Sequence, residues 1–153
     1  MHHSVSKVSS QPFASFIAAI LLIGVGSGCG GNFADHPRTY AWVFGTNAPA
    51  GVQVTRSAFW QSSHFTYEYS VFMQLTNASQ WADTLRQSGQ LVATNLPPDW
   101  RRPSLAGNVT PAWFMPKAPS HYEAWFHTND FKRDLLLARD PETGLVFYCD
   151  QQL

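Results

Sequence analysis

Residues 64–75 alternate between apolar and polar side chains, and this alternation constrains the fold more than any other feature of the chain. Apolar side chains occupy every second position, at Phe65, Tyr67, Tyr69, Val71, Met73 and Leu75. Because successive side chains of a β-strand point to opposite faces, a period of two predicts a strand with one buried face. Phe72 is the apolar exception on the other face.

Two shorter segments before it also predict strands. Residues 52–60 are rich in β-forming side chains and place four apolar ones at one parity, Val52, Val54, Ala58 and Trp60. Residues 61–63 then predict the turn of a hairpin that joins this strand to the next one. Residues 40–44 alternate aromatic and small side chains and predict a first strand, which a turn at residues 48–51 separates from the second.

One helix is predicted over residues 78–88. Asn77 can cap its first backbone N–H groups, and Gly89 can end it. Trp81 and Leu85 are four residues apart and form its apolar stripe. The remaining strands are predicted over residues 91–94, 121–127, 134–139 and 145–150, with a hairpin loop at 140–144. Residues 131–138 would also suit a helix, but a strand there lets the hairpin account for both flanks of that loop.

These elements predict an α+β fold, in which a mostly antiparallel sheet of about six to seven strands carries one mid-chain helix on one face. Residues 39–153 are expected to form a single globular domain. The 153 residues are 44% hydrophobic, which suits one domain with a core. The formal net charge of zero gives no electrostatic footprint for nucleic acid, so nucleic acid is not an expected partner.

The N-terminal segment has the character of a secretory signal. Residues 1–12 are polar and include Lys7, and residues 13–25 are apolar apart from Ser15 and Gly24. As a helix this apolar stretch would be about 20 Å long, short of the roughly 30 Å hydrocarbon core of a bilayer. The alternative is an uncleaved segment that spans the membrane poorly.

Gly26, Ser27, Gly28 and Cys29 follow this apolar stretch. The segment resembles the lipobox of bacterial lipoproteins, in which small residues precede a cysteine that is lipidated on sulfur and becomes the mature N-terminus. Gly26 departs from the family pattern, which usually has leucine or a similar aliphatic residue there. The resemblance implies a signal peptide over residues 1–28, a covalent lipid on Cys29 and a flexible tether over residues 29–38. It also implies a lipid-anchored location in the bacterial cell envelope, and Gly30, in place of an aspartate, favours the outer membrane over the inner.

The second cysteine of the chain is Cys149. If Cys29 is acylated, Cys149 has no intramolecular disulfide partner, and its apolar alternation with Leu145 and Phe147 predicts a buried thiol. If Cys29 is not acylated, a disulfide between Cys29 and Cys149 becomes possible in an oxidising compartment.

A proline-punctuated loop over residues 96–120 contains two Pro-x-Trp-x-x-Pro segments, at 98–103 and 111–116. Tryptophan on rigid backbone can stack on a sugar or anchor a partner, and arginine can stack beside it. The candidate ligand- or partner-binding residues are therefore Trp100, Arg101, Trp113, Phe114 and Trp125. In the alternative interpretation these tryptophans fold back over the core as a lid.

His121, Glu123 and His127 share one face of a predicted strand and form a candidate metal site. Three nitrogen or oxygen ligands plus water would suit zinc. A straight strand would place the two histidines about 20 Å apart, so one ion would require a bend. The sequence contains no Gly-x-Ser-x-Gly elbow, phosphate-binding loop or dinucleotide fingerprint. No catalytic residue is therefore assigned, and no cofactor is expected beyond the lipid on Cys29.

The function predicted from these features is that of a membrane-anchored envelope lipoprotein with a non-catalytic binding or assembly role. Its partner would be an envelope protein, a peptide or a glycan. The sequence leaves two alternatives open. One is a metal-assisted envelope hydrolase that uses His121, Glu123 or His127. The other is a periplasmic inhibitor or immunity-type lipoprotein.

Overall fold

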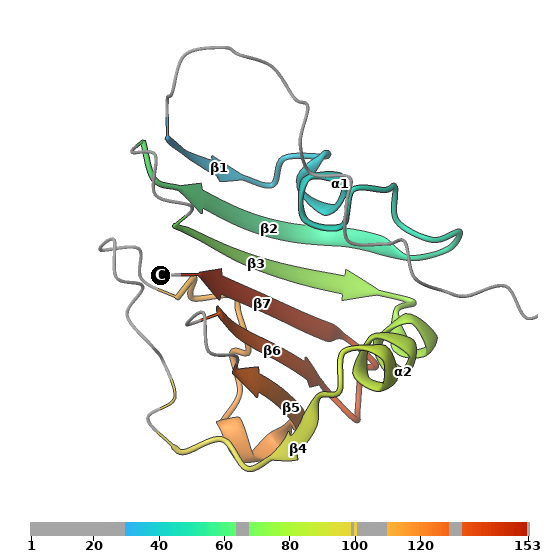
Figure 1. Ribbon diagram of the computed structural model, residues 1–153. Helices are drawn as coiled ribbons and strands as arrows, with labels where there is room; N and C mark the ends of the chain where they lie inside the picture. The colour runs from blue at the N-terminus through green and yellow to red at the C-terminus, as the bar shows by residue number, and fades with distance from the viewer. Residues whose placement is uncertain (1–29, 64–67, 99, 101–109, 129–132, 153) are drawn as a thin grey trace, which may run out of the picture.

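The computed structural model describes residues 30–63, 68–98, 100, 110–128 and 133–152. Within these residues the chain forms a seven-stranded antiparallel sheet in the order β1-β2-β3-β7-β6-β5-β4 (Figure 1). The strands are β1 (Gly31–Ala34), β2 (Gln53–Gln61), β3 (Tyr69–Thr76), β4 (Val92–Thr94), β5 (Glu123–Thr128), β6 (Arg133–Arg139) and β7 (Val146–Gln152). Two antiparallel meanders, β1–β3 and β4–β7, meet where β3 pairs with β7.

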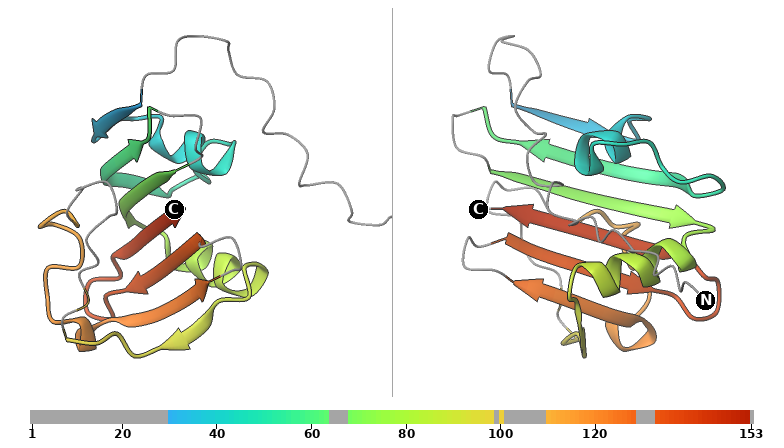
Figure 2. Two further views of the ribbon diagram at one scale, coloured as in Figure 1. Left: turned by 60° about the vertical axis from the view of Figure 1, so that its left-hand side comes forward. Right: turned by 45° about the vertical axis from the view of Figure 1, so that its right-hand side comes forward.

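The helices lie on one face of this sheet. They are α1 (Thr39–Phe44) and α2 (Ser79–Ser88). A short 3-10 helix, η1 (Pro119–His121), belongs to the segment that leads into β5. In the left view of Figure 2, α1 and α2 lie on one side of the sheet, and the segment that leads into β5 lies on the other. The sheet is therefore covered on both faces. The antiparallel sheet and the mid-chain helix are as predicted, but the sheet dominates, so the α+β description fits only loosely.

Both faces of the central strands are buried. Val71, Met73 and Leu75 of β3 pack under the helices, where Trp81 and Leu85 of α2 join them. The neighbouring side chains of the same central strands point to the opposite face and form a second cluster with the loop residues: Phe72, Leu136, Ala138, Phe147 and Cys149. This explains why Phe72 breaks the predicted alternation. Cys149 is 4% exposed, as the alternation predicted.

Residues 40–44 were predicted to form a strand, and this is wrong because they lie in α1. Tyr40, Val43 and Phe44 all pack on the helix-side cluster. Their spacing of three and four residues is that of one helix face. Gly45 ends the helix with a φ of +67°, and its N–H donates to the Ala41 carbonyl. A five-residue segment is too short for the period alone to separate the two structures.

The predicted hairpin between β2 and β3 forms, but its connection is longer than residues 61–63. Gln61 pairs with Tyr69, and the N–H of Ser62 donates to the Glu68 carbonyl at 3.0 Å. The register also shifts between Val54 and Arg56, so Val54 and Ala58 pack on opposite faces despite their shared parity. Residues 64–67 lie outside the described part of the chain.

The helix predicted over residues 78–88 is α2. Gly89 is its C-cap, as predicted, and donates its N–H to the Leu85 carbonyl, whereas the N-cap differs from the prediction. Asn77 has a φ of +54°, and Ala78 occupies the N-cap position without a side-chain hydrogen bond. At the other end, the N–H of Leu91 donates to the Arg86 carbonyl, which is the longer bond of a Schellman motif. Gln90, with a φ of +53°, takes the left-handed position that glycine usually takes there.

The β6–β7 hairpin confirms the predicted loop at residues 140–144. Arg139 pairs with Val146, and the N–H of Gly144 donates to the Asp140 carbonyl. The predicted strand over residues 134–139 is confirmed as part of β6, whereas residues 129–132 lie outside the described residues.

A buried carboxylate ties three strands together at one end of the sheet. Asp150 of β7 is 1% exposed and receives a bidentate contact from Arg133 of β6, at 2.9 Å to Nε and 2.7 Å to Nη2. The hydroxyls of Tyr69 and Tyr148 donate to its Oδ2 at 3.1 and 3.0 Å. Charge-assisted bonds of this kind offset the cost of burying the carboxylate.

The N-terminal end of the described chain is part of the sheet. Gly31–Ala34 pair with residues 58–61 of β2, and Asp35 accepts a hydrogen bond from the Ser57 N–H. The prediction of a flexible tether over residues 29–38 is therefore wrong for the residues from Gly31 onward.

Candidate functional site

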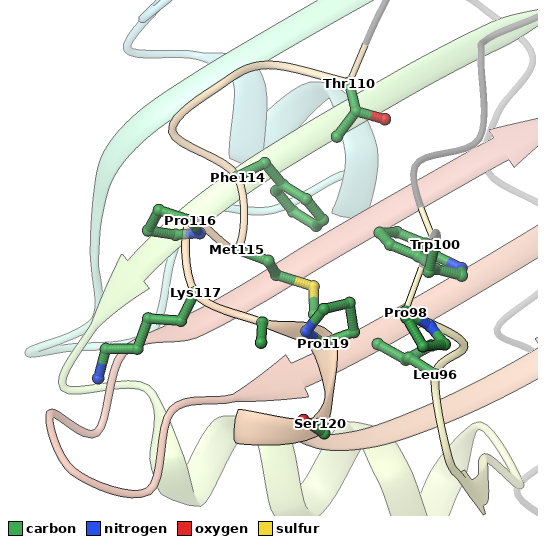
Figure 3. A pocket seen from close by; sticks show the side chains of 11 residues that line it. Leu96, Pro98, Trp100, Thr110, Phe114, Met115, Pro116, Lys117, Pro119 and Ser120 are labelled. Carbon is green, nitrogen blue, oxygen red and sulfur yellow. The ribbon is translucent and has the colours of Figure 1, made fainter.

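A pocket lies on the face of the sheet opposite the helices, beneath the loop that precedes β5. Its volume is about 310 Å³, and Figure 3 shows Trp100, Phe114 and Met115 on its walls. The full lining is Leu96, Pro98, Trp100, Thr110, Phe114, Met115, Pro116, Lys117, Ala118, Pro119 and Ser120. Most of these side chains are apolar, which is usual for a small binding pocket.

Phe114 holds the loop on the sheet. It is 3% exposed, and its ring lies 5.1 Å from that of Phe72 and 5.6 Å from that of Phe147, both nearly edge-on. Such edge-to-face pairs add to the stability from burial alone. Trp100 is half-buried and lies 6.2 Å from Phe114, so it covers the open side of this aromatic group.

Met115 adopts strained backbone geometry at the pocket wall. Its φ is +50°, a region that residues with side chains rarely occupy. Its side chain is nevertheless 5% exposed and packs with Phe114 and Tyr122 in the loop-side cluster. The Tyr122 hydroxyl accepts the N–H of Lys117 at 3.0 Å, which fixes the chain just after the strained residue. Strain of this kind persists only where the surroundings determine the conformation.

The structure divides the predicted aromatic set. Trp100 and Phe114 line the pocket, whereas Trp113 lies beside it, 6.1 Å from Phe114, with the Arg56 guanidinium 5.3 Å from its ring centroid. Trp125 is 8% exposed and belongs to the cluster on the helix side of the sheet. Arg101 lies outside the described residues.

Trp125 is a core residue with cationic neighbours. The guanidinium groups of Arg86 and Arg139 lie 5.3 and 5.5 Å from its ring centroid. The charged groups themselves therefore lie over the ring, and that of Arg139 also pairs with Glu123 at 2.6 Å. The alternative interpretation, in which tryptophans cover the core, therefore describes Trp125 better than a ligand-binding role does.

A charged cluster adjoins the pocket at Lys117. The Lys117 Nζ lies 3.1 Å from Asp140 and 2.7 Å from Glu142, and His121 Nε2 lies 3.0 Å from Asp140. His121 Nε2 also lies 2.9 Å from Lys117 Nζ, but one nitrogen cannot accept from the lysine and donate to the carboxylate at once. The cluster joins the pocket loop to the β6–β7 turn, since Asp140 also accepts the backbone N–H groups of Glu142 and Thr143.

Asp140 is held in its charged form. Burial alone would raise the pKa of its carboxyl, but hydrogen bonds from His121, Lys117 and the turn N–H groups outweigh that and hold the pKa well below its usual range. The pKa of Lys117 is raised, mainly by its bond to Glu142, and that bond lowers the pKa of Glu142 in turn. The charges therefore compensate one another within the cluster.

The predicted metal set is not brought together. His121 lies in η1 rather than on the strand, and Glu123 forms an ion pair with Arg139 at 2.6 Å. His127 lies four residues beyond Glu123 on β5. His121 instead lies near Asp140 and Glu142, and ligand atoms of these three residues all fall within 4.8 Å of one another. The Lys117 ammonium already contacts all three, so a metal ion would have to displace it.

Of the eleven residues that line the pocket, only Trp100 and Phe114 were predicted from the sequence as binding residues. Leu96, Pro98 and Met115, for example, belong to a loop for which the prolines predicted only irregular structure. Asp140 and Glu142 read as ordinary turn residues, and their approach to His121 depends on the pairing of β5 with β6.

No protein-family model, curated protein or solved structure matches this chain. Among the described residues, no helix is both long and apolar enough to cross a membrane. Cys29 and the segment before it lie outside the described residues.

Proposed function

We propose that the protein is a lipid-anchored envelope protein whose domain binds an apolar peptide side chain of a partner protein in the pocket beside Trp100. The observation that carries the proposal is the pocket itself, with walls of Trp100, Phe114 and Met115. Its volume of about 310 Å³ is at the small end for ligand sites, which suits one or two side chains better than a large molecule.

The polar groups of the pocket favour a peptide over a glycan. A sugar needs several convergent hydrogen-bonding groups, and the described lining offers the hydroxyls of Thr110 and Ser120. Lys117 also lines the pocket, but its ammonium contacts Asp140 and Glu142. An apolar side chain would cover the half-buried Trp100 without leaving polar groups unpaired.

The membrane anchor in this proposal is the covalent lipid on Cys29. It is supported by the lipobox-like segment Gly26–Cys29 and by the short apolar stretch before it. Two or more acyl chains hold a protein stably on a bilayer, whereas one gives only marginal binding. The outer membrane of the bacterial envelope is the proposed site, because Gly30 follows the cysteine.

A metal-assisted hydrolase is the weaker proposal. Its best support is the approach of His121, Asp140 and Glu142. Metal analysis of the purified protein separates the two proposals, because stoichiometric zinc would favour the hydrolase. Lys117→Ala supplies a second test, since a true site should bind zinc more tightly once the competing ammonium is removed.

The test of the binding role compares two tryptophans of one loop. We expect Trp100→Ala to abolish cross-linking of the partner in intact cells and to weaken its affinity at least about 30-fold, as for an interface hot spot. Trp113→Ala is the matched control and should change the affinity less than about threefold. Both variants should unfold cooperatively. Equal losses in the two variants, or none in Trp100→Ala, would contradict a pocket-centred site.

A further inference from the structure

Four aromatic rings gather at the β1 edge of the sheet, on its helix side. We call this group the edge patch; it consists of Phe33 of β1, His36, Trp42 of α1 and Phe59 of β2. Phe33 lies 5.4 Å from Trp42, and His36 stacks on Trp42 at 4.3 Å with an interplanar angle of 21°. Phe59 closes the group at 5.7 Å from Trp42 and 6.2 Å from Phe33.

The edge patch leaves aromatic side chains exposed to solvent. Phe33 and Trp42 are each 40% exposed, and they are two of the three large hydrophobic residues that the described chain leaves exposed. They contact each other, so the exposed surface is continuous. Contiguous exposed apolar surface is one of the features by which interaction sites are recognised.

The chain is fixed to the sheet from the first residue after Cys29. A Cβ on Gly30 would lie 2.2 Å from the backbone nitrogen of Ser63 and 2.5 Å from the Gln61 carbonyl oxygen. The backbone at Gly30 is thus pressed against the end of β2, and β1 begins at Gly31. A lipid on Cys29 would therefore be attached directly to this corner of the domain, without a spacer.

The length of chain sets how far the edge patch can lie from the bilayer. Phe33 is four residues from Cys29, so their Cα atoms are at most about 14 Å apart. The headgroup region on each side of the hydrocarbon core is roughly 5–8 Å thick. A domain anchored at Cys29 thus keeps Phe33 and Trp42 close to that region, and a modest tilt places them in it.

We propose that the edge patch rests in the headgroup region of the membrane that holds the lipid of Cys29, and so orients the domain on the bilayer. This inference rests on the lipid anchor proposed above. Tryptophan, with an apolar ring and a polar N–H, favours the interface between water and lipid. Arg38 is exposed at the start of α1, two residues after His36 of the edge patch, and an arginine at the membrane surface can contact lipid phosphates.

Quenching of tryptophan fluorescence by brominated lipids tests this contact. The lipid-modified protein, confirmed by its intact mass, is placed in phosphatidylcholine vesicles with bromine near the headgroup end of the acyl chains. We expect strong quenching of the unaltered protein and loss of most of it in Trp42→Phe. Trp113→Phe is the matched control, because it removes a half-buried tryptophan from the opposite face and should keep the quenching.

The possible outcomes separate this inference from the anchor. A protein whose mass lacks the lipid overturns both. A lipidated protein that is quenched equally with and without Trp42, or not at all, overturns the edge-patch inference and leaves the anchor intact. A lipidated protein without quenching that forms Trp42-dependent dimers in detergent assigns the edge patch to a second copy instead.

Discussion

Tyr148→Phe tests how the buried carboxylate of Asp150 stabilises the sheet. Tyr148 is 1% exposed, and its hydroxyl donates to Asp150 Oδ2 at 3.0 Å. The substitution removes one hydrogen bond to a charged acceptor and leaves the ring in place. Such bonds contribute about 1.5–3 kcal/mol. Because Arg133 and Tyr69 still donate to the carboxylate, the low end of that range, about 1.5–2 kcal/mol, is expected at pH 7.

The same network predicts a dependence on alkaline pH. Burial, and then the charge of Asp150, raise the pKa of both Tyr148 and Tyr69. Above the ordinary tyrosine pKa near 10, the unfolded chain loses these protons while the folded chain keeps them. The stabilisation is therefore fully present below about pH 10 and is lost as the pH rises toward the raised pKa. Each such tyrosine lowers the free energy of unfolding by up to about 1.4 kcal/mol per pH unit.

The assay is urea unfolding of wild type and Tyr148→Phe at pH 7, 10 and 11. At neutral pH the variant should unfold at lower urea with an unchanged slope. At pH 11 the unfolded wild type loses the Tyr148 hydroxyl proton that the folded wild type keeps, which lowers its free energy of unfolding. The variant has no such proton, so the difference in stability between the two proteins should have mostly disappeared. Tyr69→Phe, in which the ring is only half-buried, should show a smaller effect at neutral pH. A penalty for Tyr148→Phe below about 0.5 kcal/mol, or one that stays constant up to pH 11, would refute this reasoning.

Three further substitutions test other parts of the structure. Asp140→Asn should destabilise the protein at pH 7, and urea titrations should show a smaller penalty at pH 3. The stabilisation from the lowered carboxyl pKa is fully present above the ordinary value near 4 and is lost as the pH falls from there toward the lowered pKa. A penalty independent of pH would contradict the assignment. Gln90→Gly should stabilise the protein by about 1 kcal/mol, because the φ of +53° favours glycine; a lower melting temperature would show that Gln90 makes a compensating contact. Gly30→Ala should weaken hydrogen-exchange protection in β1 alone, because its Cβ would meet backbone atoms of residues 61–63; unchanged protection would show that this corner adapts.

The long elements could be predicted from the sequence because their patterns extend over many residues. Six alternating apolar positions predicted a strand over residues 64–75, and four of them, Tyr69, Val71, Met73 and Leu75, lie in β3, while Phe65 and Tyr67 lie outside the described residues. The Trp81–Leu85 stripe predicted α2. The prediction of a strand over residues 40–44 was wrong because five residues fit both the period of a strand and that of a helix. The packing of Tyr40 and Phe44 against the sheet decides in favour of a helix. Short segments take their structure from what they pack against.

The candidate site could be predicted only in part, because it depends on pairing between distant segments. The proline-punctuated loop drew attention to Trp100 and Phe114, and both line the pocket, while their binding role stays a prediction. The face on which Trp125 lies follows from its parity in β5, and the approach of His121 to Asp140 follows from the β5–β6 pairing. The β5–β6 pairing has no local signal in the sequence, and parity alone does not say which face of the sheet the helices cover.

The central claim is that a lipid on Cys29 ties this domain to a membrane. The most direct test is the intact mass of the protein extracted from bacterial membranes. We predict the mass of residues 29–153 with a diacylglyceryl group attached, and accumulation of the unmodified precursor in Cys29→Ser. A membrane-bound protein with the full mass of residues 1–153 and no lipid would contradict it.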